Sequence, residues 1–308
     1  MKNLSNLLTD AFKIDPDGFL GLINQINQLL SEEKVESDKT RIIGRLIQIP
    51  PIGEATVIGD LHGDIESLMH ILEESRFIEK SYKGEEVLLI FLGDYGDRGP
   101  YSPEVYHVTL SLKEIFPERV ILLQGNHEGP EDLLAYPHDL PYDFQKKFGS
   151  QGREIYEELS RLFRRFYMAV IIDRKFLMLH GGAPSKAANL EDIAYAYEKH
   201  PAESHLEEIL WSDPRENIRG TYPSPRGAGR LFGEDVTERL LKISNVRILI
   251  RGHEPSNDGY KINHSGKILT LFSRKGAPYY NLKGAYLHLD LSMNIDYMRQ
   301  LEPSIRQF

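Results

Sequence analysis

Residues 87–99 read VLLIFLGDYGDRG, a run of apolar side chains followed at once by glycines, two aspartates and an arginine. An apolar run of this length that stops at polar residues predicts a strand buried on both faces. Other short apolar runs end in the same manner, and each is followed by a residue that can bind a metal ion. These runs are residues 55–58, 120–123, 176–179 and 246–250. Together they predict an α/β protein whose strands end in polar loops.

The polar segments after these runs are expected to form one shared site. They are Gly59–Asp64, Gly93–Gly99, Gly125–Glu128, His180–Gly182 and Arg251–Glu254. In open α/β sheets, ligands bind outside the carboxyl ends of the strands, where loops from neighbouring strands converge. Each segment alone is weak evidence, since Asp and Asn beside Gly are common turn residues and a single histidine is usually structural. The agreement of five strand ends favours a site.

Oxygen and imidazole donors dominate these loops, and they suit hard or borderline divalent cations. The chain has no cysteine, which excludes thiolate ligands, a thiolate nucleophile and disulfides. Asp60 and His62 would hold one cation, and the two oxygens of Asp94 could bridge to a second. The remaining ligands of the second cation would be Asn126, His180 and His253. Two cations about 3.5–4 Å apart can acidify a shared water and hold phosphoryl oxygens during in-line attack.

Four further side chains beside the predicted ligands suit the chemistry of phosphate esters. His127 is the candidate general acid, and Asp97 is its expected carboxylate partner, which would fix the tautomer and favour the protonated form. Arg98 and Arg226 are candidate phosphate clamps, because a guanidinium binds two phosphoryl oxygens at once and stays charged. The structural alternative for Arg98 is a pair with surface acids.

The other histidines lack such a context and are expected to be structural hydrogen-bonding residues. They are His70, His107, His138, His200, His205, His264 and His288.

The whole chain of 308 residues, with a net charge of −9, is acidic and long enough for a large core. This charge argues against sequence-independent binding to nucleic acid, which relies on clustered lysine and arginine. Residues 1–20 lack the apolar stretch of a signal peptide, and no run has membrane-spanning length. We therefore expect a cytoplasmic protein without membrane association. Helical spacing in residues 19–30 predicts a helical N-terminal segment, residues 1–50, packed on a catalytic domain of residues 51–308, so that the chain forms a single domain overall.

Three of the loop segments resemble the signature motifs of the phosphoprotein phosphatases: GDLHG at 59–63, GDYGDRG at 93–99 and GNHE at 125–128. WSDP at 211–214, RGAG at 226–229 and APYY at 277–280 are similar to further segments of that family. The resemblance is to type-1-like serine/threonine phosphatases and, given the divergent first fifty residues, to a prokaryotic or archaeal member. It implies a calcineurin-like metallophosphoesterase fold: two packed mixed β-sheets flanked by helices, with a dimetal site at the strand ends.

The resemblance also implies an activity. Phosphoserine and phosphothreonine proteins would be hydrolysed by in-line attack of a hydroxide that bridges two divalent metal ions, Mn²⁺ foremost and Fe, Zn, Co or Ni as alternatives. The residues assigned to the metals are Asp60, His62, Asp94, Asn126, His180 and His253. Those assigned to the acid pair and the phosphate are His127, Asp97, Arg98, Arg226, Asn126 and Tyr280. No matching residues indicate regulatory subunits.

Some features depart from the family or leave alternatives open. Arg274-Lys275-Gly276 is inserted before Ala277, which changes the loop that would place Tyr280 above the metals. A metallophosphoesterase acting on diesters or dinucleoside polyphosphates would share the first motifs. Pro255 favours the phosphatase, because many such diesterases have a second histidine at that position. A non-catalytic scaffold that binds phosphoproteins would be expected to have lost metal ligands, and here all the candidate ligands are present.

Overall fold

Two large mixed sheets form the centre of the protein. A computed structural model describes residues 3–33, 35–36 and 40–308. The strands of the seven-stranded sheet are, in spatial order, β1 (Arg41–Ile43), β2 (Leu46–Ile49), β6 (Ala169–Ile172), β7 (Phe176–Met178), β11 (Ile248–Arg251), β13 (Ile268–Leu271) and β12 (Tyr260–Asn263). Those of the five-stranded sheet are β15 (Ile305–Gln307), β14 (Ala285–Asp290), β3 (Glu54–Ile58), β4 (Val87–Phe91) and β5 (Val120–Leu122).

Successive residues of the central strands alternate between two apolar layers. In β4, Leu89 and Phe91 join the cluster beneath the outer helices, whereas Ile90 joins the cluster between the two sheets. In β7, Leu177 faces outward and Met178 faces the layer between the sheets. Because both faces of these strands are buried, their sequences are continuous apolar runs. The five predicted strands are confirmed as β3, β4, β5, β7 and β11.

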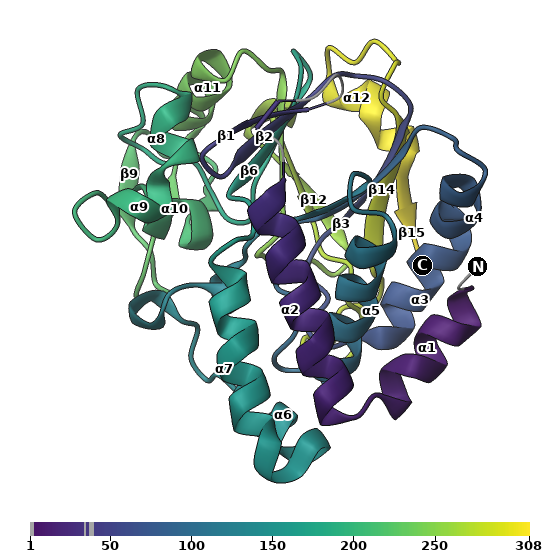
Figure 1. Ribbon diagram of the computed structural model, residues 1–308. Helices are drawn as coiled ribbons and strands as arrows, with labels where there is room; N and C mark the ends of the chain where they lie inside the picture. The colour runs from purple at the N-terminus through teal and green to yellow at the C-terminus, as the bar shows by residue number, and fades with distance from the viewer. Residues whose placement is uncertain (1–2, 34, 37–39) are drawn as a thin grey trace.

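Helices cover the outer faces of both sheets (Figure 1). The five-stranded sheet is covered by α1 (Leu4–Lys13), α2 (Pro16–Glu32), α3 (Ile65–Ser75), α4 (Phe77–Tyr82), α5 (Ser102–Ile115), α6 (Leu140–Phe148) and α7 (Gly152–Phe163). The seven-stranded sheet is covered by α8 (Leu190–Ala194), α9 (Ala196–Lys199), α10 (His205–Trp211) and α11 (Glu234–Ile243). The short helix α12 (Met298–Leu301) packs at the layer between the sheets.

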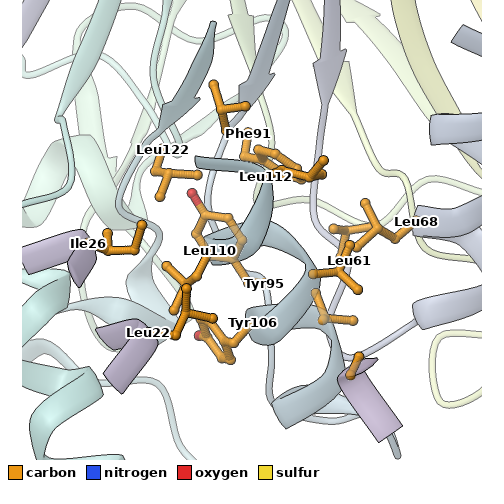
Figure 2. Close-up of a cluster of buried hydrophobic side chains, with 14 of the residues drawn as sticks. Leu22, Ile26, Leu61, Leu68, Phe91, Tyr95, Tyr106, Leu110, Leu112 and Leu122 are labelled. Carbon is orange, nitrogen blue, oxygen red and sulfur yellow. The ribbon is translucent and has the colours of Figure 1, made fainter. Parts of the chain in front are cut away.

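Aromatic side chains fill the space between the five-stranded sheet and its helices. Figure 2 shows Tyr95 and Tyr106 lying between α2, represented by Leu22 and Ile26, and the strand residue Phe91. The ring centroids of Tyr95 and Tyr106 are 5.7 Å apart. This packing fixes the loop after β4 from beneath, and that loop carries the candidate ligand Asp94.

A third sheet adds to the two that the resemblance implied. Within the described residues it consists of β8 (Asp213–Pro214), β10 (Arg230–Phe232) and β9 (Thr221–Pro223), in that spatial order. The connection between β9 and β10 contains Arg226.

The first fifty residues contribute strands as well as helices. The side chain of Asp15 caps α2 by accepting a hydrogen bond of 2.8 Å from the Gly18 amide, and Pro16 lies in the first turn. Helix α2 packs against α5 and α7, whereas β1 and β2 extend the seven-stranded sheet. The expected boundary after residue 50 therefore separates parts of one sheet. Among the described helices, none combines the length and the apolar character that a membrane span requires.

Candidate metal centre

The candidate ligands lie where strands from both sheets end. Asp60 follows β3 and Asp94 follows β4. Asn126 is the first residue of the short 3₁₀ helix Asn126–Glu128, which follows β5. His180 and His253 follow β7 and β11 of the other sheet. A bridge between Asp60 and Phe272 joins the two sheets at this edge. The structure therefore brings all the predicted ligand positions together.

The backbone of these loops is shaped to turn the ligands inward. His62, Asp94 and His253 have φ values of 45°, 55° and 74°, in the left-handed region that residues with a Cβ seldom occupy. Gly125 permits a close approach, because a Cβ there would lie 2.2 Å from Oδ1 of Asp94. A side chain at this position would collide with a candidate ligand.

Glu128 ties the loops after β4 and β5 to each other. Its buried carboxylate accepts hydrogen bonds from the amides of Asp94 at 2.8 Å and Tyr95 at 3.1 Å, and from the Tyr106 hydroxyl at 2.6 Å. Glu128 is part of the motif at 125–128, but no role was predicted for it from the sequence. The structure shows that it supports the Asp94 loop.

The first group of ligands consists of Asp60, His62 and Asp94. Nδ1 of His62 lies 3.2 Å from the carbonyl oxygen of Gly96, which only accepts, so the proton is on Nδ1 and the Nε2 lone pair is free. That lone pair faces Oδ2 of Asp60 at 3.7 Å and Oδ2 of Asp94 at 3.6 Å. The lone pairs of these three atoms repel one another, and a cation bound between them would be coordinated by all three.

The second group uses the other oxygen of Asp94. Nδ1 of His180 donates to the Leu92 carbonyl at 2.9 Å, which leaves the Nε2 lone pair 3.4 Å from Oδ1 of Asp94 and 3.0 Å from Oδ1 of Asn126. Nδ1 of His253 lies 3.2 Å from the same Asn126 oxygen. Asp94 therefore stands between both groups, as a bridging ligand must.

Electrostatics show that this cluster lacks a positive charge of its own. Burial raises the pKa of Asp60 to about 7, and burial together with the charges of Asp60 and Glu128 raises the pKa of Asp94 well above its usual range. Burial also lowers the pKa values of His62, His180 and His253 well below their usual range. Oδ2 of Asp60, which lies 3.7 Å from Nε2 of His62 within the first group, is buried without a hydrogen-bond partner. The donor set therefore fits two divalent cations, which would compensate the carboxylates.

The acid pair lies beside the first group. Nδ1 of His127 is 2.7 Å from Oδ2 of Asp97, and the His127 ring centroid is 4.8 Å from that of His62. Although burial opposes it, hydrogen bonds from His127 and His138 hold the pKa of Asp97 well below its usual range. Asp97 is therefore ionised and accepts from Nδ1 of His127, which leaves Nε2 for the substrate.

The structure also brings in His138, which the sequence analysis had treated as structural. Nδ1 of His138 lies 3.0 Å from the same Oδ2 atom of Asp97 that contacts His127. His138 belongs to the loop before α6 and follows no predicted strand. A search limited to strand ends could not find it, because its proximity to Asp97 depends on how this loop folds back.

The two arginines line a cavity of about 600 Å³ together with His127 and with the candidate ligands His62, Asp94, Asn126 and His253. Arg98 donates from Nη2 to the Tyr136 carbonyl at 3.3 Å. The structural alternative was an ion pair with a surface acid, and among the described residues Arg98 forms none. Arg226 donates from Nε to Oδ2 of Asp213 at 2.6 Å, and the fully buried Arg251 donates to the other oxygen at 2.9 Å. The supporting residues Asp213 and Arg251 carried no predicted role.

Tyr280 does not occupy the position that the resemblance implied. Its side chain is 78% exposed and lies outside the cavity, whereas Tyr279 lines the cavity. The ring centroid of Tyr279 is 5.2 Å from that of His62 and 5.0 Å from that of Phe272. The inserted Arg274 donates to the His62 carbonyl and to Ala277, and its guanidinium lies 5.8 Å from the Tyr279 centroid. The altered loop therefore presents the preceding tyrosine.

Comparison with known proteins agrees with this geometry. Residues 55–257 match the calcineurin-like phosphoesterase family. The chain belongs to this family. Among curated proteins, this chain is similar to a probable serine/threonine-protein phosphatase of Encephalitozoon cuniculi, with 36% identity over 85% of this chain and 56% of that protein. It is also similar to serine/threonine-protein phosphatase 5 of Arabidopsis thaliana, with 33% identity over 79% of this chain and 44% of that protein.

The chain spans about half the length of these two relatives. A solved protein serine/threonine phosphatase from Saccharomyces cerevisiae shares its fold, with a TM-score of 0.73, 24% identity, and coverage of 96% of this chain and 90% of that one. These similarities support the resemblance to phosphoprotein phosphatases. All three proteins are eukaryotic and two of them are related by name to type 5, so they do not support the expected type-1-like and prokaryotic affiliation.

Proposed function

We propose that this chain is a metal-dependent serine/threonine protein phosphatase that hydrolyses phosphomonoesters. The observation that carries the proposal is one cavity that is lined by His127, by two arginines and by four candidate ligands, with Asp97 2.7 Å from Nδ1 of His127. A site for one hydrolytic reaction needs these three components within reach of the same phosphoryl group. Separately, each component would have a structural explanation.

The ligands would hold two divalent cations. One would be held by Asp60, His62 and Asp94, and the other by Asp94, Asn126, His180 and His253. When bound, such cations supply Lewis acidity that lowers the pKa of water and polarises a phosphoryl oxygen. We infer Mn²⁺ as the cation of first choice, with Fe, Zn, Co and Ni as alternatives, because the donors are carboxylate, amide and imidazole groups.

The remaining site residues have distinct tasks. Arg98 and Arg226 bind the phosphoryl oxygens, since both guanidinium groups border the cavity and stay charged at any working pH. His127 gives a proton from Nε2 to the leaving alkoxide oxygen, while Asp97 holds its Nδ1. Tyr279 and Trp211 border the same cavity and restrict the approach of water from those sides.

A phosphomonoester is favoured over a diester or a dinucleoside polyphosphate. Two arginines and two divalent cations would together carry six positive charges, which suit the dianionic group of a monoester better than the single charge of a diester. The relatives above carry the name serine/threonine-protein phosphatase. Phosphoserine and phosphothreonine proteins are therefore the proposed partners, and the net charge of −9 argues against nucleic acid. The cytoplasmic location expected from the sequence stays a prediction.

A substrate panel tests this proposal. The protein would be stripped with a chelator, reconstituted with Mn²⁺, and assayed on phosphoserine, phosphothreonine and phosphotyrosine peptides, a phosphodiester and a dinucleoside polyphosphate. We expect no activity before reconstitution, and afterwards the highest kcat/KM on phosphoserine or phosphothreonine. Asp94→Asn serves as the control that activity belongs to this chain. Full activity after complete chelation, or a preference for the diester, would overturn the proposal.

A further inference from the structure

His138 contacts the acid pair through the carboxylate of Asp97. Oδ2 of Asp97 lies 2.7 Å from Nδ1 of His127 and 3.0 Å from Nδ1 of His138. Because an ionised carboxylate only accepts hydrogen bonds, both histidines donate to it from Nδ1. The two imidazoles therefore share one oxygen atom as acceptor, each through its Nδ1.

The other ring nitrogen of His138 is also occupied. Nε2 of His138 lies 2.7 Å from the hydroxyl of Tyr156 in α7. Burial, followed by the charge of Asp97, raises the pKa of Tyr156 to about 12, so the phenol keeps its proton and can donate it to Nε2. This contact orients the His138 ring so that the proton on Nδ1 points at Asp97.

The loop that carries His138 makes further hydrogen bonds to Asp97 and Arg98. The Asp139 amide donates to Oδ1 of Asp97 at 2.8 Å, and the Tyr136 carbonyl accepts from Arg98 at 3.3 Å. The same Oδ1 atom accepts from the Arg98 amide at 3.0 Å. Residues 136–139 thus contact both the carboxylate of the acid pair and one phosphate-binding arginine. This arrangement exceeds what packing alone requires of a surface loop.

We propose that His138 is a positioning residue for the general acid: through Asp97 it fixes the ring of His127, and Tyr156 in turn orients His138. The inference rests on the proposed phosphomonoester hydrolysis, in which His127 protonates the leaving oxygen. The proposal involves no proton transfer along the series Tyr156, His138 and Asp97. Each hydrogen bond restricts the next group, so that Nε2 of His127 is held towards the cavity without a search through other rotamers.

Variants at two positions separate the contacts. His138→Phe keeps a planar ring and removes both hydrogen bonds. His138→Asn retains a short amide that can reach Asp97 but not Tyr156, and Tyr156→Phe removes the outer contact alone. His200→Phe is the matched control, because the side chain of His200 is 12% exposed against 14% for His138 and also pairs with an aspartate, Asp132, at 2.7 Å.

The measurement is kcat/KM for a phosphoserine peptide and for aryl phosphates with leaving groups of decreasing pKa. We expect His138→Phe to lose about tenfold on the peptide, the scale of one hydrogen bond to a charged group, and little on p-nitrophenyl phosphate. Tyr156→Phe and His138→Asn should lose less, with the same dependence on the leaving group. His200→Phe should show no such dependence. Metal content and melting temperature are recorded for every variant.

A double variant decides whether His138 acts through His127. In a His127→Asn background, His138→Phe should cause no further loss, since the group that it positions is gone. An equal loss on all substrates, or an additive loss in the double variant, would make His138 a structural residue and overturn the proposal. If the wild type ignores the peptide but cleaves aryl phosphates, the substrate assignment fails, and the aryl series still tests His138.

Discussion

Arg226 donates from Nε to Oδ2 of Asp213 over 2.6 Å. The other oxygen of Asp213 accepts at 2.9 Å from Nη2 of Arg251, whose side chain is fully buried. Arg251 is itself fixed by the Gly181 carbonyl at 2.6 Å and by Glu254 at 2.8 Å. Asp213 is thus an anchored acceptor that holds Arg226 by one edge of its guanidinium. The terminal nitrogens remain available to the cavity, which Arg226 lines.

Arg226→Ala should weaken the binding of substrate and of free phosphate. A charge-assisted bidentate contact is present in both the ground state and the transition state, so the inhibition constant of phosphate and KM should rise together. We expect an increase of about ten- to a hundredfold. Asp213→Asn keeps the arginine but weakens its anchor, and it should cause a smaller increase. Unchanged phosphate inhibition in Arg226→Ala would remove this residue from the site.

Asp94→Asn and His62→Ala should differ in their metal content. Asp94 has one oxygen 3.6 Å from His62 and the other 3.4 Å from His180, so its replacement affects both groups of ligands. His62→Ala removes a ligand from one group only. Metal analysis should show that Asp94→Asn loses both ions, whereas His62→Ala loses mainly one. Equal stoichiometry in both variants and the wild type would contradict these assignments.

Tyr279→Ala should impair the enzyme more than Tyr280→Ala does. The Tyr279 ring packs near His62 and Phe272 at the cavity, whereas Tyr280 is largely exposed. Loss of such aromatic contacts is worth about 0.5–1.5 kcal/mol, or roughly two- to tenfold in KM or kcat. Tyr280→Ala is the matched control, one residue away in the same loop. If Tyr280→Ala has the larger effect on a phosphopeptide, the position of this loop in solution must differ from that described.

The convergence of the candidate ligands was predictable because local sequence and sheet geometry both specify their positions. Each follows an apolar run long enough to identify as a strand, and strand ends converge by the rules of α/β sheets. The position of Asp94 between two groups follows from the same reasoning. These residues needed no knowledge of distant contacts.

Other parts of the site depend on tertiary packing that no local pattern encodes. His138 reaches Asp97 only because the loop before α6 folds back, 41 residues along the chain from Asp97. Asp213 and Arg251 interact across 38 residues. The position of Tyr279 at the cavity depends on a loop in which Arg274 donates to the His62 carbonyl, 212 residues away along the chain. The third sheet likewise comes from strands of two or three residues, which are too short to show a period.

His127→Asn should slow the reaction in proportion to how poor the leaving group is. A serine alkoxide needs a proton to depart, whereas p-nitrophenolate is stable as an anion near neutral pH. General acid catalysis is worth about 10²–10⁴-fold, which is the expected loss on a phosphoserine peptide. On p-nitrophenyl phosphate the loss should be clearly smaller. Asp97→Asn should show the same pattern in weaker form, because the imidazole remains but loses the partner 2.7 Å from its Nδ1.

Metal content must be measured in the same His127→Asn preparation. The His127 amide donates to Oδ1 of Asp94 at 3.1 Å, so a change at this residue could disturb a candidate ligand. The backbone amide is kept in His127→Asn, and we therefore expect unchanged metal content. If both substrates slow equally while the metal is retained, His127 positions the phosphoryl group or the nucleophile. In that case the leaving oxygen receives its proton from another donor, and the roles inferred for Asp97 and His138 change with it.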